Sequence, residues 1–175
     1  MIKYVPRMTS VVLEEIPDKL TLAVDISNCQ GTCIGCHSPF LRDNVGEELT
    51  PGIIDSLLAD NFGVNCFLFL GEGNDHAALM RLARHLRTAH PELEIALYSG
   101  RETVEDDIWE IFDYVKVGPY IPKFGPLNHR STNQRLYRLL RPGEDAPAVL
   151  EKEGRRFADI TSRFWHKGID PNYRK

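Results

Sequence analysis

The stretch VNCFLFLGEGND, residues 64–75, decides the fold class of this chain. Residues 64–70 are almost all apolar, so a strand made from them is buried on both faces, like a central strand of a parallel sheet. Residues 71–75 form a turn in which Asn74 or Asp75 can cap a helix, and apolar residues recur at helical spacing between 79 and 86. A buried strand, a turn and an amphipathic helix in succession predict a βαβ unit.

The same alternation continues along much of the chain. Apolar runs at 20–26, 93–99 and 113–120 predict three further strands, and a helix is expected to begin at the Thr50–Pro51 pair. Strands separated by helices predict a parallel sheet with right-handed crossovers. Eight βα units need about 250 residues. At 175 residues, we therefore expect one domain, residues 1–175, folded as an open, partial parallel β/α barrel.

The pattern weakens after Pro126. The segments TNQRLYRLLRPG (132–143) and GRRFADITSRFW (154–165) fit either two closing strands or loosely docked segments.

Composition restricts the function classes. Hydrophobic residues make up 42% of the chain and charged residues 26%, and the formal net charge is −4. No global positive field would attract nucleic acid. The opening MIKYVPRMTS is neither a signal peptide nor an anchor, and no run of about 18 apolar residues occurs. We expect a cytoplasmic protein with reduced thiols.

Three cysteines follow the first predicted strand closely. Cys29, Cys33 and Cys36 lie in NCQGTCIGCHSP (28–39) with the spacing C-x3-C-x2-C. Three thiolates can bind three irons of a four-iron cluster and leave the fourth iron without a protein ligand. An open position on a metal centre is usually kept for a small molecule. The triad therefore predicts a reactive iron–sulfur cluster.

Other interpretations of the cysteines remain open. Residues 33–37 read C-x-x-C-H, the attachment pattern of c-type haem, but that requires export and leaves Cys29 unused. A C-x-x-C redox pair does not need Cys29 either. Structural zinc would use the three cysteines and His37, although adjacent Cys36 and His37 fit one tetrahedron poorly. Cys66, inside an apolar strand, is expected to pack in the core.

Further polar residues follow the predicted strands, at the edge where parallel α/β proteins build their sites. Gly71 and Glu72 suit close approach of a cationic group such as an ammonium, or else form a plain turn. Ser99 and Arg101 follow the third strand. Lys116 is expected to face either a carboxylate or solvent. The histidines show no metal-ligand spacing and are expected on surfaces or helices: His76, His85, His90, His129 and His166.

The cysteine loop and the Gly/Glu turn together resemble the radical S-adenosylmethionine superfamily. Several stretches resemble the activating proteins of anaerobic (class III) ribonucleoside-triphosphate reductases, and the resemblance covers nearly the whole chain. These stretches are the cysteine loop with CHSP, YSGR (98–101), KVGPY (116–120), TNQRLY (132–137) and DIT-x-RFW (159–165).

The resemblance implies roles for individual residues. Cys29, Cys33 and Cys36 would be the ligands of a 4Fe-4S cluster. Gly71 and Glu72 match the end of a Gly-Gly-Glu turn that holds the methionine amino group, with Leu70 in place of the first glycine. Gly35 stands where an aromatic residue often packs near the adenine, and His37 would take over some of that packing. Ser99 and Lys116 match positions near the cofactor loosely.

The resemblance also implies an activity. The reduced cluster would cleave S-adenosylmethionine to methionine and a 5′-deoxyadenosyl radical, which takes a hydrogen atom from a glycine of the large reductase subunit. An electron donor such as flavodoxin would reduce the cluster. Two alternatives remain: a small radical enzyme acting on a small molecule, and a non-enzymatic iron–sulfur or haem electron carrier.

Overall fold

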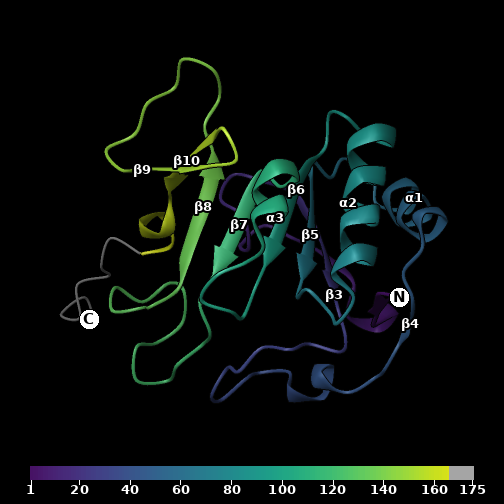
Figure 1. Ribbon diagram of the computed structural model, residues 1–175. Coiled ribbons are helices and arrows are strands. Elements are labelled where there is room, and N and C mark those ends of the chain that lie inside the picture. The colour runs from purple at the N-terminus through teal and green to yellow at the C-terminus, as the bar shows by residue number, and fades with distance from the viewer. Residues whose placement is uncertain (166–175) are drawn as a thin grey trace, which may run out of the picture.

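A computed structural model describes residues 1–165 (Figure 1). Its main feature is an eight-stranded mixed sheet of order β2-β3-β5-β6-β7-β8-β10-β9. The strands, in that order, are Ser10–Val12, Thr21–Asp25, Cys66–Leu70, Glu94–Tyr98, Tyr114–Val117, Arg135–Leu139, Arg155–Asp159 and Val149–Lys152. A small second sheet pairs β1 (Lys3–Tyr4) with β4 (Glu47–Glu48).

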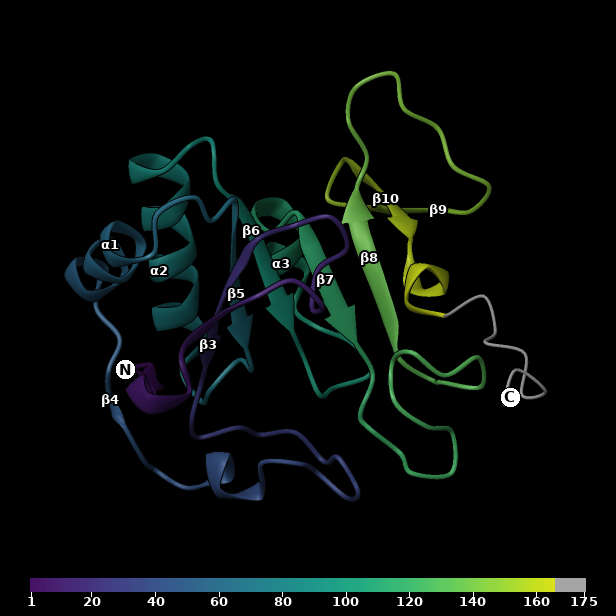
Figure 2. The same ribbon diagram turned by 180° about the vertical axis from the view of Figure 1, so that it is seen from behind.

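Three α-helices connect the four parallel strands β3, β5, β6 and β7. They are α1 (Pro51–Asp60), α2 (His76–Ala89) and α3 (Asp106–Ile111). Short 3₁₀ helices are η1 (Pro6–Met8), η2 (Pro39–Arg42) and η3 (Thr161–Phe164). Because the strand order advances in one direction and crossovers share one hand, the α-helices cover the same face of the sheet. Figure 2 shows the other face, over which the purple N-terminal segment runs.

Two caps begin the longer helices as the sequence indicates. The Thr50 side chain accepts a hydrogen bond from the Ile53 amide at 3.3 Å, and Pro51 opens the first turn of α1. Asp75, rather than Asn74, caps α2 by accepting from the Ala78 amide at 2.9 Å. These bonds satisfy amides that would otherwise lack partners at a helix start.

The core has a thick layer on the helical face of the sheet and a thinner one on the other. Phe67, Phe69 and Phe112 are fully buried under the helices. Leu68 and Cys66 point to the opposite face, as the two-residue period of β5 requires. Cys66 is the core residue that the sequence predicts, and burial raises the pKa of its thiol.

The prediction of an open, partial parallel β/α barrel is wrong. Only β3, β5, β6 and β7 pair in parallel, and the pairs β2–β3, β7–β8, β8–β10 and β10–β9 are antiparallel. Within residues 1–165 the α-helices number three, of 10, 14 and 6 residues. A barrel of this type needs a helical crossover after each strand. After β7 the chain returns by loops and by a tight turn at Glu153–Gly154, where both residues have positive φ.

The segments after Pro126 form strands. Residues 132–143 contain β8 and residues 154–165 contain β10, so of the two alternatives the closing strands are confirmed. None of the helices in the described part combines the length and apolar character needed to cross a bilayer.

Candidate functional site

Three loops meet at the carboxyl edge of the parallel strands, which is the lower edge in Figure 1. They are the cysteine loop after β3, the turn 71–75 after β5 and the segment 99–101 after β6. Between them lies a cavity of about 170 Å³. Its lining residues are Cys29, Gln30, Gly31, Glu72, Gly73, Asn74, His76, Gly100, Arg101 and Glu105. The predicted convergence of chemistry-bearing loops on this edge is confirmed for these three segments.

The cysteine loop presents free, half-buried thiols. The amide of Gly31 donates to Cys29 Sγ at 3.3 Å, and the amide of Tyr120 donates to Cys33 Sγ at 3.2 Å. Arg42 binds the Cys33 carbonyl oxygen at 2.8 Å and holds the loop against η2. Amide donors to sulfur favour the thiolate form and are a means by which proteins tune bound metal clusters.

The pKa of Cys29 is raised. Burial is the largest cause, and the neighbouring thiols of Cys33 and Cys36 add to it, while the Gly31 amide and Arg42 oppose it. Without a metal the Cys29 thiol therefore keeps its proton at neutral pH. A bound cation would displace that proton, since metal ligands bind as thiolates.

The three sulfur atoms are not gathered at one point in the structure. They do not form a group whose ligand atoms all lie within 4.8 Å of one another, so at least one pair is farther apart. Tetrahedral zinc, with Zn–S of about 2.3 Å, brings its sulfurs within roughly 4 Å. In a multi-iron cluster each thiolate binds a different iron, so the sulfurs need not meet at one point.

Two glycines let the loops approach the thiols closely. A Cβ atom at Gly100 would lie 3.1 Å from Cys33 Sγ, and one at Gly31 would lie 3.2 Å from Cys29 Sγ. Both are tighter than ordinary packing contacts. The sequence prediction did not single out either glycine, because the close approach depends on how two loops fold over each other.

Glu72 lies at the centre of a charged network in the cavity. Its carboxylate accepts from the Ser99 hydroxyl and from Arg101, whose Nε and Nη2 lie 3.2 and 2.6 Å from Oε1 and Oε2. Arg101 also binds Glu105. Hydrogen bonds to Glu105 and Glu72 raise the pKa of the Arg101 guanidinium, and Arg101 lowers the pKa of Glu105. The cavity thus contains a carboxylate and a guanidinium side by side.

The turn before Glu72 requires glycine. Gly71 has φ +113°, in a region that side chains rarely adopt, and its amide donates to the Tyr98 carbonyl oxygen at 3.0 Å. This bond ties the turn to the end of β6. The geometry directs the Glu72 side chain toward Ser99 and Arg101.

Lys116 is buried and does not reach solvent. Its side chain is 7% exposed, and Nζ donates to the carbonyl oxygens of Gly118 at 3.0 Å and Ser99 at 3.4 Å. Burial lowers its pKa to about 8, an effect that Cys33, Glu15 and Cys29 oppose. The alternative in which Lys116 extends to solvent is therefore wrong, and the carboxylate that acts on its charge is that of Glu15.

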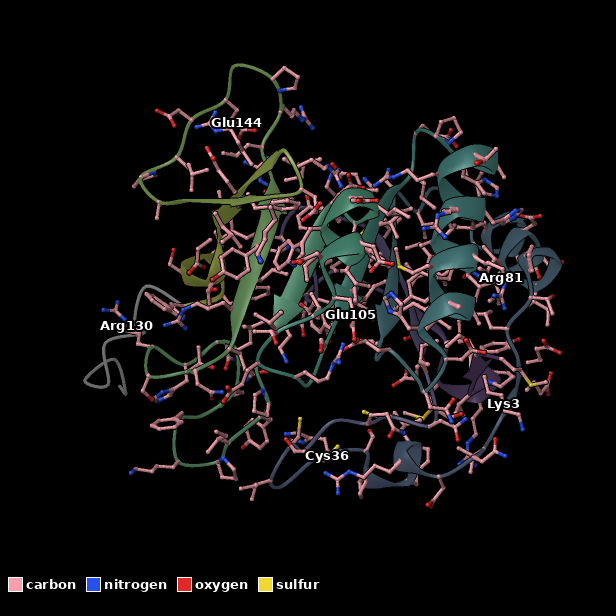
Figure 3. The ribbon with its side chains drawn as sticks, in the orientation of Figure 1. Lys3, Cys36, Arg81, Glu105, Arg130 and Glu144 are labelled. Atoms are coloured by element: carbon pink, nitrogen blue, oxygen red, sulfur yellow. The ribbon has the colours of Figure 1, made fainter. Side chains whose placement is uncertain are left out.

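Gly35 and His37 lie apart from the cavity lining. Both are exposed. The ring of His37 lies 5.4 Å from that of Tyr120, and a Cβ atom at Gly35 would meet Pro122 at 3.0 Å. The cavity lining also lacks Cys33, Cys36 and Lys116. Some of the predicted site residues therefore line the cavity, and others lie around it. Figure 3 shows Cys36 on the loop below the sheet and Glu105 higher in the view, near the lower ends of the strands.

Two histidines meet one carboxylate between α1 and α2, a grouping that the sequence prediction did not include. His85 Nε2 and His90 Nε2 each lie 2.8 Å from Asp55 Oδ1. His76 lines the cavity and contacts Asp107 at 2.8 Å. His76 and His85 lie in α2, His90 directly follows that helix, and all three are partly exposed, so the expectation of surface or helix histidines is confirmed for them. His166 lies outside the described residues.

Comparison of the chain with protein-family models, with curated proteins and with solved structures gives no match.

Proposed function

We propose that this chain is a radical S-adenosylmethionine enzyme that activates an anaerobic ribonucleoside-triphosphate reductase. Cys29, Cys33 and Cys36 would bind a 4Fe-4S cluster with one iron free of protein ligands. The observation that carries the proposal is the cavity at the strand ends, which is lined both by Cys29 and by the Glu72–Arg101 pair. A metal ligand and a zwitterion-binding pair border one small space.

The thiols fit such a cluster chemically. They are free, and two of them already accept backbone amide hydrogen bonds. A cluster does not require the three sulfurs to meet at one ion, because each thiolate binds a different iron. The loop supplies three sulfur donors in the described chain, and the fourth cysteine, Cys66, is buried in the core where it cannot act as a further ligand.

The charged pair fits the amino-acid end of S-adenosylmethionine. That end carries one ammonium and one carboxylate, and Glu72 and Arg101 offer the complementary charges within 2.6 Å of each other. Ser99 and Glu105 hold the two side chains in place. Binding would exchange the internal ion pair for two ligand contacts, so the site is charged and oriented before the ligand enters.

A bound, reduced cluster would supply one electron for cleavage of the sulfonium C–S bond, which would give methionine and a radical able to take a hydrogen atom from a glycine of the reductase. The chain's own residues position the ligand and limit access of water. Glu72 and Arg101 fix the amino-acid end, and Gly100 lets the β6 loop close against Cys33. The carboxyl edge of the sheet is the face that would receive the partner's glycine loop, with an electron donor such as flavodoxin supplying electrons.

The test is anaerobic reconstitution with iron and sulfide, reduction with dithionite, and measurement of 5′-deoxyadenosine after addition of S-adenosylmethionine. We expect product from the wild type and none from Cys33→Ala. Cys66→Ala is the matched control, since it removes a cysteine outside the loop and should keep the activity. Full cleavage by Cys33→Ala would refute the ligand assignment.

The partner is tested in the same mixture by adding an anaerobic ribonucleotide reductase and recording its electron paramagnetic resonance spectrum. A glycyl radical signal that depends on the reduced chain and S-adenosylmethionine is the expected result. Cleavage without any radical on the reductase would instead indicate a radical enzyme with a small-molecule substrate.

A further inference from the structure

A second group of metal-ligating side chains lies between α1 and α2. Asp55 lies in α1, His85 lies near the end of α2, and His90 directly follows the last residue of α2. The two Nε2 atoms and the carboxylate oxygen all lie within 4.8 Å of one another. This group does not touch the cavity described above.

The end of α2 explains how two histidines five positions apart reach one point. Residues five apart on a regular helix point in different directions, because the helix has 3.6 residues per turn. His90 leaves the helical conformation, with φ −133° and ψ 64°, while its amide still donates to the Leu86 carbonyl oxygen at 2.9 Å. Its ring turns back to within 6.3 Å of the His85 ring, measured between centroids.

We propose that Asp55, His85 and His90 form a binding site for a divalent transition-metal ion of the zinc class. Two imidazoles and one carboxylate are a common donor set for such ions. Zinc ligands at about 2.0–2.1 Å stand roughly 3.3 Å apart in a tetrahedron. The distances from Asp55 Oδ1 to the two nitrogens are 2.8 Å, so a small outward movement of the rings admits the ion.

The surroundings suit entry and binding of an ion. The histidine side chains are 25% and 26% exposed and Asp55 is 45% exposed, so solvent reaches the group while helix packing restricts the rings. With three protein donors, water would complete the coordination.

The site is distant from the cysteine loop. His76, at the start of α2, lines the cavity, while His90 follows the last residue of that helix. At 1.5 Å per residue the 14 residues of α2 span about 20 Å. In Figures 1 and 2 α1 and α2 lie side by side, so the ion would join the crossover helices of two βαβ units.

The test uses the full chain with Cys29, Cys33 and Cys36 replaced by serine, so that the loop thiols cannot bind the probe. Titration with Zn²⁺ in a calorimeter at pH 7.5 should show one ion per chain. The melting temperature of this serine-substituted chain should rise by about 5–10 °C at a free Zn²⁺ concentration 100 times Kd. Because this chain cannot form the cluster, the result does not depend on the proposed enzymatic function.

Substitutions in that background identify the ligands. His85→Gln and Asp55→Asn should each weaken Zn²⁺ binding at least about 100-fold, since even changes outside the coordinating residues cost 10–100-fold. His129→Gln is the matched control, because His129 lies on a separate loop and contacts Ser131. Binding that survives both ligand substitutions, or no stoichiometric binding at all, overturns the proposal.

A second measurement covers the case in which the serine chain fails to fold. Co²⁺ added to the intact chain can also bind the loop thiols, which give a near-ultraviolet thiolate-to-cobalt band; the proposed nitrogen and oxygen site should add a separate component of visible absorption. That component should disappear in His85→Gln and persist in His129→Gln. A cobalt spectrum that is entirely thiolate in character, and is unchanged in His85→Gln, also overturns the proposal.

Discussion

Replacement of Lys116 by methionine should change how stability depends on pH. The Lys116 ammonium is buried beside the Gly118 and Ser99 carbonyl oxygens, and burial lowers its pKa from 10.5 to about 8. The folded chain therefore releases this proton at lower pH than the unfolded chain. Between about pH 8 and 10.5 the unfolded chain binds more protons at Lys116 than the folded chain does. The free energy of unfolding therefore rises with pH across this range, and the gain is lost again as the pH falls to 8.

The size of the effect follows from the pKa difference. At about 1.4 kcal/mol for each unit of pKa, a fall from 10.5 to about 8 costs the folded state about 3 kcal/mol when the lysine is charged. Lys116→Met removes that cost, and also leaves two carbonyl oxygens without a donor, at about 1 kcal/mol each. We expect the variant to be about 1 kcal/mol more stable than wild type at pH 7. That advantage should become a deficit of about 2 kcal/mol by pH 10.5.

The assay is urea unfolding of the reduced, metal-free chain at several pH values from 7 to 10.5. Tyrosines and cysteines titrate in the same range, but they are present in both chains, so the difference between the two free energies of unfolding isolates Lys116. Lys116→Arg is the control: its guanidinium stays charged throughout, so its deficit relative to wild type should grow with pH. A difference between wild type and Lys116→Met that stays constant across the range would refute the burial of a charged group at this position.

Three further outcomes test the site and the fold. Glu72→Gln should raise KM for S-adenosylmethionine at least about tenfold, because it removes the negative charge that would bind the ammonium of the ligand; an unchanged KM in the 5′-deoxyadenosine assay argues against this binding mode. Gly100→Ala should lower the iron bound after reconstitution, since its Cβ would lie 3.1 Å from Cys33 Sγ, with equal iron content as the opposing result. Thr50→Ala should cost about 1 kcal/mol in urea unfolding by removing the cap of α1, and no loss would mean that the cap is dispensable.

The sequence predicted the parallel half of the sheet well. The runs at 20–26, 64–70, 93–99 and 113–120 became β3, β5, β6 and β7 with small shifts at their ends. These strands are buried between two layers, so they are apolar on both faces. A continuous apolar run in the sequence is enough to indicate that burial. Asp75 and Thr50 likewise carry short-range capping signals that need no tertiary information.

The antiparallel half was not predictable in the same way. Whether β8 pairs with β7 in an antiparallel sense depends on the path of the loop after Val117, and that loop has no periodic pattern. Extending the βα alternation to the whole chain produced the expectation of a barrel. The absence of a helical pattern between 118 and 134 was the available signal against it.

The candidate site likewise has a part that the sequence predicts and a part that it does not. The rule that ligands bind at the carboxyl ends of parallel strands brought the cysteine loop and Glu72 together correctly. The pairing of Glu72 with Arg101, the approach of Gly100 and the meeting of Asp55 with His85 depend on loop and helix packing between distant segments. No spacing in one segment encodes such contacts.

The central claim is a cluster bound by Cys29, Cys33 and Cys36 with one iron open to S-adenosylmethionine. Electron paramagnetic resonance of the reconstituted, reduced chain, recorded with and without S-adenosylmethionine, tests it most directly. The account predicts a cluster signal that shifts when S-adenosylmethionine is added, and little or no shift in Glu72→Gln at the same ligand concentration. A chain that assembles no cluster, or a cluster whose signal is the same with and without saturating S-adenosylmethionine, would contradict it.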